Sequence, residues 1–120
     1  PRYRWHGEIA HAELRRVYAR SHLLVLPSIM EGGANVISEA VMADLPVVAS
    51  RIPGTVGLLG DDYPGYYPVE DTRSLRDLLL RAEADSGFRA SLGEHCRALR
   101  PLFSEQAESK GWSDLLAELR

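Results

Sequence analysis

Cysteine and long apolar segments are scarce in this sequence. Cys96 is the only cysteine among 120 residues, which excludes a disulfide framework and predicts a reducing, cytoplasmic compartment. Every apolar run is far shorter than the ~20 residues that a membrane-spanning helix needs, so we expect no membrane span. The sequence begins at Pro1 and not at a methionine, which indicates a piece excised from a longer protein.

A basic stripe and a metal-binding pattern are also missing. The 14 basic and 17 acidic residues give a net charge of –3, and the basic residues are scattered. This balance argues against a general affinity for nucleic acid or for anionic membranes. The four histidines have no metal-ligand spacing among themselves or with the cysteine, and no G-x-G-x-x-G dinucleotide motif is present. We therefore expect no metal and no cofactor.

Alternating strand and helix patterns organise the chain around residues 23–50. Two apolar runs, 23–26 and 47–50, are too continuous for half-exposed strands and predict buried parallel strands, with a loop and a helix over 35–43 between them. The other predicted elements are helices over 11–21, 72–84, 87–99 and from Ser104 onward, short strands around 3–9 and 66–69, and a loop over 51–68. This alternation predicts an α/β fold, a Rossmann-like parallel sheet with helices on both faces.

Two glutamates bracket the loop and the helix that follow the first buried strand. Glu31 lies in the loop and Glu39 about one turn inside the helix, with the free amides of residues 34–37 between them. Carboxylates suit sugar hydroxyls, and helix-start amides with the positive end of the helix dipole suit a diphosphate. The pattern therefore predicts a nucleotide-sugar site at the carboxyl end of the sheet, where ligands of parallel sheets bind. The alternative is that both glutamates are solvated surface residues.

Two further polar residues are ambiguous from the sequence alone. Ser28 follows a proline where the first buried strand ends, so it can contact a ligand or simply cap the loop. Arg51 follows the next buried strand, where it can offset phosphate charge or serve as an ordinary surface arginine.

A series of motifs in order resembles the C-terminal, donor-binding half of retaining GT-B glycosyltransferases, in particular the GT4 (glycosyltransferase group 1) family. The series is W-H-G-E-I (5–9), E-L-R-R-V-Y-A-R-S (13–21), L-V-L-P-S (24–28), E-G-G-A-N-V-I-S-E-A (31–40) and P-V-V-A-S (46–50). The resemblance continues to F-S-E-Q-A-E-S-K-G-W (103–112) and so covers nearly the whole chain.

The resemblance implies an enzyme that transfers a glycosyl group from a nucleotide sugar, expected to be UDP-linked, with retention and without a divalent metal. In it, Glu31 would be catalytic, facing the donor sugar and the positive charge that develops at the anomeric carbon. Glu39 would accept hydrogen bonds from the ribose hydroxyls. The remaining donor-binding positions implied are Ser28, Gly32, Gly33, Ala34, Asn35 and Val36.

The chain also departs from the family pattern. The family usually has an aromatic residue and a glycine where Gly33 and Ala34 stand, and a glycine where Asp44 ends the helix, which bears on sugar selectivity. The basic pair for the diphosphate and the N-terminal acceptor domain fall outside residues 1–120. The acceptor therefore stays unknown, and we expect the piece alone to be inactive and to dimerise through exposed strand edges.

Other functions remain as alternatives. Residues 50–68 with E-G-G-A-N-V resemble a bacterial subfamily that includes selenosugar synthases, which join a selenium donor to a UDP-sugar. A UDP-sugar 2-epimerase shares the fold, but its serine-glycine-glycine motif is not matched. A third alternative is a non-catalytic nucleotide-sugar binding or interaction module. A receiver domain would need clustered acids after its first strand, and none occur there.

Overall fold

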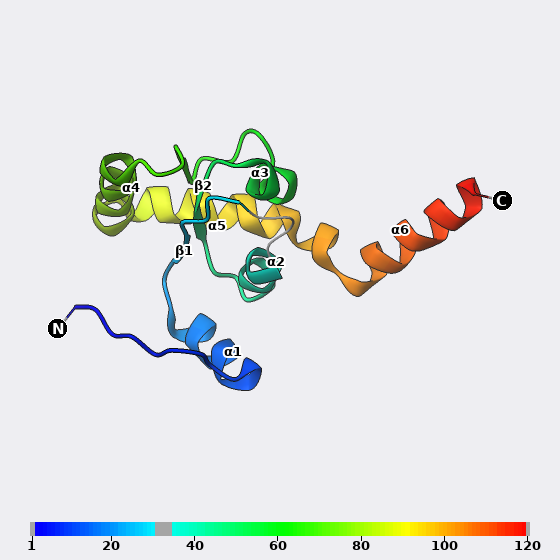
Figure 1. The fold of residues 1–120 in the computed structure, drawn as a ribbon, viewed down its shortest axis with the longest axis horizontal. Coiled ribbons are helices and arrows are strands. Elements are labelled where there is room, and N and C mark those ends of the chain that lie inside the picture. Colours follow the sequence, from blue (N-terminus) through cyan, green and yellow to red (C-terminus); the bar gives the residue numbers. More distant parts are fainter. Residues whose placement is uncertain (1, 31–34, 120) are drawn as a thin grey trace.

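A computed structural model describes residues 2–30 and 35–119 of the chain (Figure 1). Strands and helices alternate along it, as the sequence predicts. The elements are α1 (His11–Arg20), β1 (Leu24–Leu26), α2 (Asn35–Met42), β2 (Val47–Ser50), α3 (Pro53–Leu59), β3 (Tyr66–Tyr67), α4 (Thr72–Ala84), α5 (Ser86–Leu99), a 3-10 turn η1 (Arg100–Phe103) and α6 (Glu105–Glu118).

The described strands form one parallel sheet in the order β1-β2-β3. Leu24–Leu26 pair with Val47–Ala49, and Ala49–Ser50 pair with Tyr66–Tyr67. Every residue of β2 is buried, which confirms the prediction for the second apolar run. The prediction for the first run was wrong in degree, because β1 is only half-buried. Within the described residues β1 has a neighbour on one side alone, and an edge strand keeps part of its surface open.

The core forms where helices pack against β2. Helices α2 and α5 contact β2 and each other, and α4 contacts β3 and α5. The apolar residues with no exposed surface come from three of these elements: Ile37, Ala40 and Val41 in α2, Val47, Val48 and Ala49 in β2, and Leu92 in α5. This arrangement of helices around a parallel sheet confirms the predicted α/β class.

The short strand expected around residues 3–9 is absent. Residues 2–9 have no strand, and the side chains of Tyr3 and Trp5 are 76% and 80% exposed. A strand needs a neighbour to pair its main-chain groups. No described strand lies beside residues 2–9, so their alternating polar and apolar pattern is not sufficient to form a strand.

The loop expected over residues 51–68 contains helix α3. Pro53 begins it with a backbone angle already suited to a helix. The hydroxyl of Thr55 accepts a hydrogen bond from the amide of Ile52 at 3.2 Å and donates to the carbonyl of Ser50 at 2.6 Å. These bonds stabilise the helix start, so the glycines and prolines of this stretch mark a short helix and its turns.

Aspartates cap helices α4 and α5 near their predicted starts. Asp71 accepts a hydrogen bond from the amide of Ser74 at 2.9 Å, which lowers the pKa of its carboxyl group. Asp85 accepts one from the amide of Phe88 at 3.0 Å at the start of α5. The cap of the first helix was predicted from the sequence, and the second one also lies close to the predicted boundary.

Asp44 ends α2 in the left-handed conformation, as its position after the helix indicates. Its φ is +59°, its amide donates to the carbonyl of Val41, and the amide of Leu45 donates to the carbonyl of Ala40. This pair of bonds is a Schellman motif. The carboxylate of Asp44 also accepts a hydrogen bond from the guanidinium of Arg100 at 3.2 Å, which joins the end of α2 to η1.

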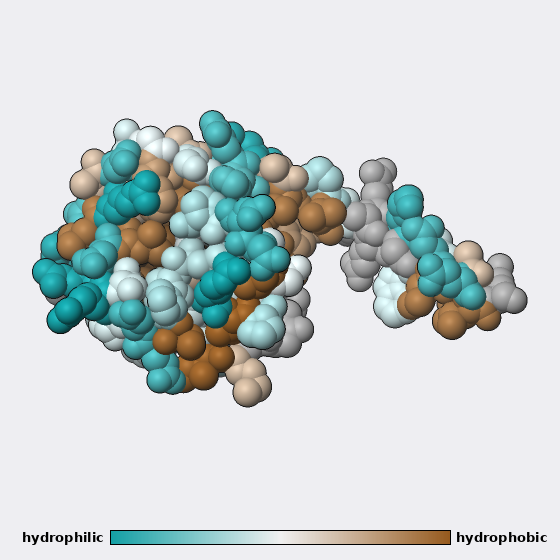
Figure 2. Space-filling view, turned by 90° about the horizontal axis from the view of Figure 1, so that it is seen from above, coloured by the Kyte–Doolittle hydropathy of each residue, from teal (hydrophilic) through white to brown (hydrophobic). Residues whose placement is uncertain are grey.

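Helix α6 projects from the body, and the molecule measures 56 × 31 × 27 Å (Figure 1). Its large apolar side chains Trp112, Leu115 and Leu116 are exposed, as is Leu119 directly after it. Figure 2 shows hydrophobic side chains gathered on this projecting arm. The helix begins next to Ser104, as predicted, but its apolar face does not pack into the core.

Gly65 lies where the main chain has no room for a side chain beside β2. A Cβ atom there would lie 2.6 Å from both the Tyr63 ring and the Val47 carbonyl oxygen. We expect Gly65→Ala to destabilise the chain by about 3 kcal/mol, as overpacked core sites do. Gly57→Ala is the matched control, because Gly57 has open space around it in α3, and we expect it to stabilise by about 0.5–1 kcal/mol. Urea unfolding followed by circular dichroism measures both, and equal stability of the two variants would contradict the packing.

The left-handed turn at Asp44 can be tested with two substitutions that both remove the carboxylate facing Arg100. A side chain with a Cβ in this conformation costs about 1–2 kcal/mol, whereas glycine adopts it freely. We therefore expect Asp44→Gly to be more stable than Asp44→Ala by about 1 kcal/mol. Thermal unfolding compares them, and the reverse order would mean that α2 does not end in this turn.

Candidate functional site

The carboxyl ends of β1 and β2 are joined by a short hydrogen bond. The hydroxyl of Ser50 donates to the carbonyl oxygen of Ser28 at 2.5 Å. Ser50 is buried and Ser28 is half-buried. The bond anchors the start of the loop that leads to α2 through the main chain of Ser28, so it tests neither the capping nor the ligand interpretation of that side chain. Ligand contact by Ser28 stays a prediction.

Much of the predicted loop lies outside the described residues. This applies to the proposed catalytic Glu31 and to Gly32, Gly33 and Ala34. Asn35 and Val36 form the first turn of α2, so the predicted helix start is confirmed. The first amides of a helix have no acceptor within it, and those of α2 open at the carboxyl side of the sheet.

Glu39 lies one turn inside α2 and faces α1. It is half-buried, and its Oε2 accepts a hydrogen bond of 3.2 Å from the hydroxyl of Tyr18. Burial, this hydrogen bond and the negative charge of Glu39 raise the pKa of Tyr18 to about 12. Glu39 is therefore not the freely solvated surface residue of the alternative interpretation. Its partner was missed from the sequence, because helical spacing marks Tyr18 as inward-facing but does not say what its hydroxyl meets.

A cavity of about 620 Å³ lies between α1 and α2, with Tyr18 and Glu39 on its walls. This volume is within the range of small-molecule sites, ~300–1,000 Å³. Its lining combines polar groups with apolar surface and includes His11, Arg15, Ser38, Met42 and Phe103. The carboxylate that the sequence singled out thus borders a space large enough for part of a nucleotide.

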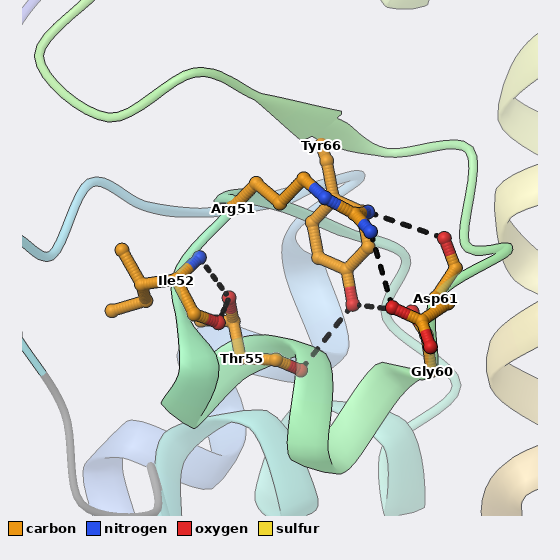
Figure 3. Close-up of polar contacts among 6 residues, drawn as sticks. All are labelled: Arg51, Ile52, Thr55, Gly60, Asp61 and Tyr66. Carbon is orange, nitrogen blue, oxygen red and sulfur yellow. Dashed lines mark hydrogen bonds and ion pairs between the residues drawn. The ribbon is translucent and has the colours of Figure 1, made fainter.

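Arg51 is held in a structural cluster at the end of β2 (Figure 3). Its guanidinium donates to the Asp61 carbonyl at 3.2 Å and to the Asp61 carboxylate at 3.1 Å, and it lies 5.1 Å from the centre of the Tyr66 ring. The hydroxyl of Tyr66 donates to the carbonyl of Gly60 at 2.7 Å. Burial raises the pKa of Tyr66 to about 12, and the positive charge of nearby Arg51 offsets part of this rise. The cluster ties the loop after α3 to β2, which favours a surface arginine over a phosphate ligand and gives it a structural partner that the sequence did not indicate.

Cys96 lies in the core. Its side chain is 1% exposed, its sulfur is 3.4 Å from the hydroxyl of Tyr63, and burial raises the pKa of the thiol. A buried thiol of raised pKa is a poor nucleophile, so the surroundings of Cys96 favour a structural role in the core. In the described part of the chain no three histidine, cysteine, aspartate or glutamate side chains form a metal-binding group. None of the helices described is both long and apolar enough to cross a membrane.

Comparisons with known proteins bear on the fold and the family. The structure matches sucrose-phosphate synthase from Thermosynechococcus elongatus with a TM-score of 0.79 and 28% sequence identity. The match covers 94% of this chain and 29% of that chain, so the chain spans less than a third of that enzyme. It confirms the Rossmann-like α/β fold of a GT-B domain. No curated protein matches the sequence.

The family profile "Glycosyl transferases group 1" matches residues 1–98, from the N-terminal segment almost to the end of α5. The matched region includes β1, the loop after it, Glu39 and the whole described sheet. This agrees with the resemblance that the ordered motifs indicated. The chain belongs to the glycosyl transferases group 1 family.

Proposed function

We propose that residues 1–120 form the C-terminal, donor-binding part of a glycosyltransferase that uses a nucleotide sugar. The observation that carries the proposal is Glu39, a half-buried carboxylate on the wall of a 620 Å³ cavity, one turn inside the helix that follows the Glu31 loop. Membership of the glycosyl transferases group 1 family supports the reaction class. The donor is expected to be UDP-linked.

In the proposed mechanism, the parts of the donor are bound by different features of this region. The start of α2 binds the diphosphate, because its free amides and the positive end of the helix dipole attract negative charge. Glu39 accepts hydrogen bonds from the ribose hydroxyls, and the cavity beside it takes the nucleoside. These groups hold the leaving diphosphate as the bond to the anomeric carbon breaks.

We assign Glu31 the role of facing the sugar of the donor. A carboxylate facing the anomeric carbon would stabilise the positive charge that develops there as the diphosphate leaves. The acceptor oxygen then bonds to the same face of the sugar while its proton passes to the departing diphosphate, so the configuration is retained and no divalent metal is required. These assignments come from the family resemblance of the E-x7-E motif, and Glu31 lies outside the described residues.

The acceptor side is proposed to lie in another part of a longer protein. The chain spans only 29% of the sucrose-phosphate synthase chain that it matches, which fits a donor-binding part without an acceptor domain. The narrower likeness to selenosugar synthases, the cytoplasmic location and dimerisation through the edge of β1 all stay predictions.

The role of Glu39 can be tested by donor titration of the full-length protein. UDP, UDP-glucose, UDP-N-acetylglucosamine and GDP-mannose are titrated by calorimetry. Losing hydrogen bonds to a charged group should weaken binding about 10- to 100-fold in Glu39→Ala. Glu94→Ala removes an exposed carboxylate on α5 and is expected to bind as the wild type does. If no nucleotide binds to the wild type, the proposed function is wrong.

Glu31 is expected to act on the rate and not on nucleotide affinity. Loss of one group that stabilises the transition state lowers kcat by about 10²–10³. We therefore expect Glu31→Ala to show that loss in a transfer assay while its Kd for the nucleoside diphosphate stays close to that of the wild type. Equal effects of Glu31→Ala and Glu39→Ala on both quantities would contradict the separation of roles.

A further inference from the structure

The contact between α1 and α2 is made by a tyrosine whose two ends meet different surroundings. Tyr18 is 6% exposed, and its ring belongs to the hydrophobic core. Its hydroxyl reaches the cavity wall, where it donates to Oε2 of Glu39 at 3.2 Å. The ring is therefore immobilised by packing, and it carries its hydroxyl to a fixed place beside the carboxylate.

A glutamate on a cavity wall needs such a partner if it is to bind a ligand well. Glutamate is among the side chains that lose most rotamer freedom when they become ordered. A fixed donor on one carboxylate oxygen orders the side chain before the ligand arrives, which is the usual source of preorganised affinity. An ionised carboxylate has about four acceptor positions, so one hydrogen bond from Tyr18 leaves room for two hydroxyl donors.

We propose that Tyr18 is a positioning residue for nucleotide binding, whose hydroxyl holds Glu39 in the orientation that accepts hydrogen bonds from the ribose of the donor. This inference rests on the proposed function, since it needs Glu39 to be the ribose ligand. It adds a residue from α1 to a site that the sequence placed wholly on the loop after β1 and on α2.

The protonation states agree with this role. The raised pKa of Tyr18 keeps its hydroxyl protonated at neutral pH, so it is a donor and the carboxylate an acceptor. The oxygen–oxygen distance is longer than the usual ~2.7–2.8 Å for hydroxyl donors. The 3.2 Å contact is therefore a weak hydrogen bond, and it directs one oxygen of Glu39 toward α1.

The experiment uses Tyr18→Phe in the full-length protein, because phenylalanine keeps the packed ring and removes only the donor. Calorimetry measures Kd for UDP and GDP and for their 2′-deoxy forms, and a transfer assay measures KM and kcat. Tyr63→Phe is the matched control, since it also removes a buried tyrosine hydroxyl but one that bonds to the main chain of Val47. Glu39→Ala and the double variant Tyr18→Phe/Glu39→Ala complete the cycle.

We expect Tyr18→Phe to weaken binding of the ribose nucleotide about tenfold, the scale of one lost hydrogen bond to a charged group, and to affect the 2′-deoxy form less. The donor KM should rise with kcat little changed. The same substitution should have no further effect in Glu39→Ala, because the tyrosine acts through the glutamate. Tyr63→Phe should keep the wild-type preference for ribose.

The outcomes separate the two proposals. If the wild type binds no nucleoside diphosphate, the proposed function fails and the role of Tyr18 fails with it. If Glu39→Ala loses ribose preference while Tyr18→Phe keeps it, the function stands and the positioning role is overturned. A fall in melting temperature in Tyr18→Phe without a change in ribose preference also overturns that role, because it would show only a structural tie between α1 and α2.

Discussion

The burial of β2 between two parallel neighbours and two packed helices is the constraint on which the rest of the structure depends. All four of its residues are buried, and its main chain pairs with β1 on one side and β3 on the other. Apolar burial on this scale is the main favourable contribution to folding of a small domain. Hydrogen bonds from side chains also hold both ends of this short strand. The hydroxyl of Tyr63 bonds to Val47 at one end, and Ser50 bonds to the loop after β1 at the other.

The candidate site follows from how that strand orients α2. The helix contacts β2 and α5 and buries Ile37 and Val41 in the core, and helical geometry then directs Glu39 toward α1. Its end is set by the left-handed turn at Asp44 and the bond from Arg100. The helix that carries the proposed nucleotide ligand is thus held along its length by core packing and at its end by backbone geometry. A site on a rigid element is what preorganised binding requires.

The cluster of Arg51, Asp61 and Tyr66 shows how a polar group near a proposed site can be structural (Figure 3). An arginine after a buried strand has the charge to meet a phosphate, and the sequence left that role open. The fold instead brings Asp61 beside it through α3 and the turn that follows. Exposed ion pairs of this kind contribute little stability each, so the value of the cluster lies in fixing the path of the loop.

The sequence by itself determined the alternation of elements, the buried central strand, the start of α2, the caps near Asp71 and the left-handed turn at Asp44. These features depend on local periodicity, capping chemistry and backbone preference, all of which act over a few residues. The family also followed from ordered motifs.

Only the tertiary structure decided that residues 2–9 form no strand, that Pro53–Leu59 is a helix and that Arg51 pairs with Asp61. It also decided that Tyr18 meets Glu39, 21 positions along the chain. Such features depend on which neighbours are present in space, and spacing along the sequence does not encode a hydroxyl on one helix meeting a carboxylate on another.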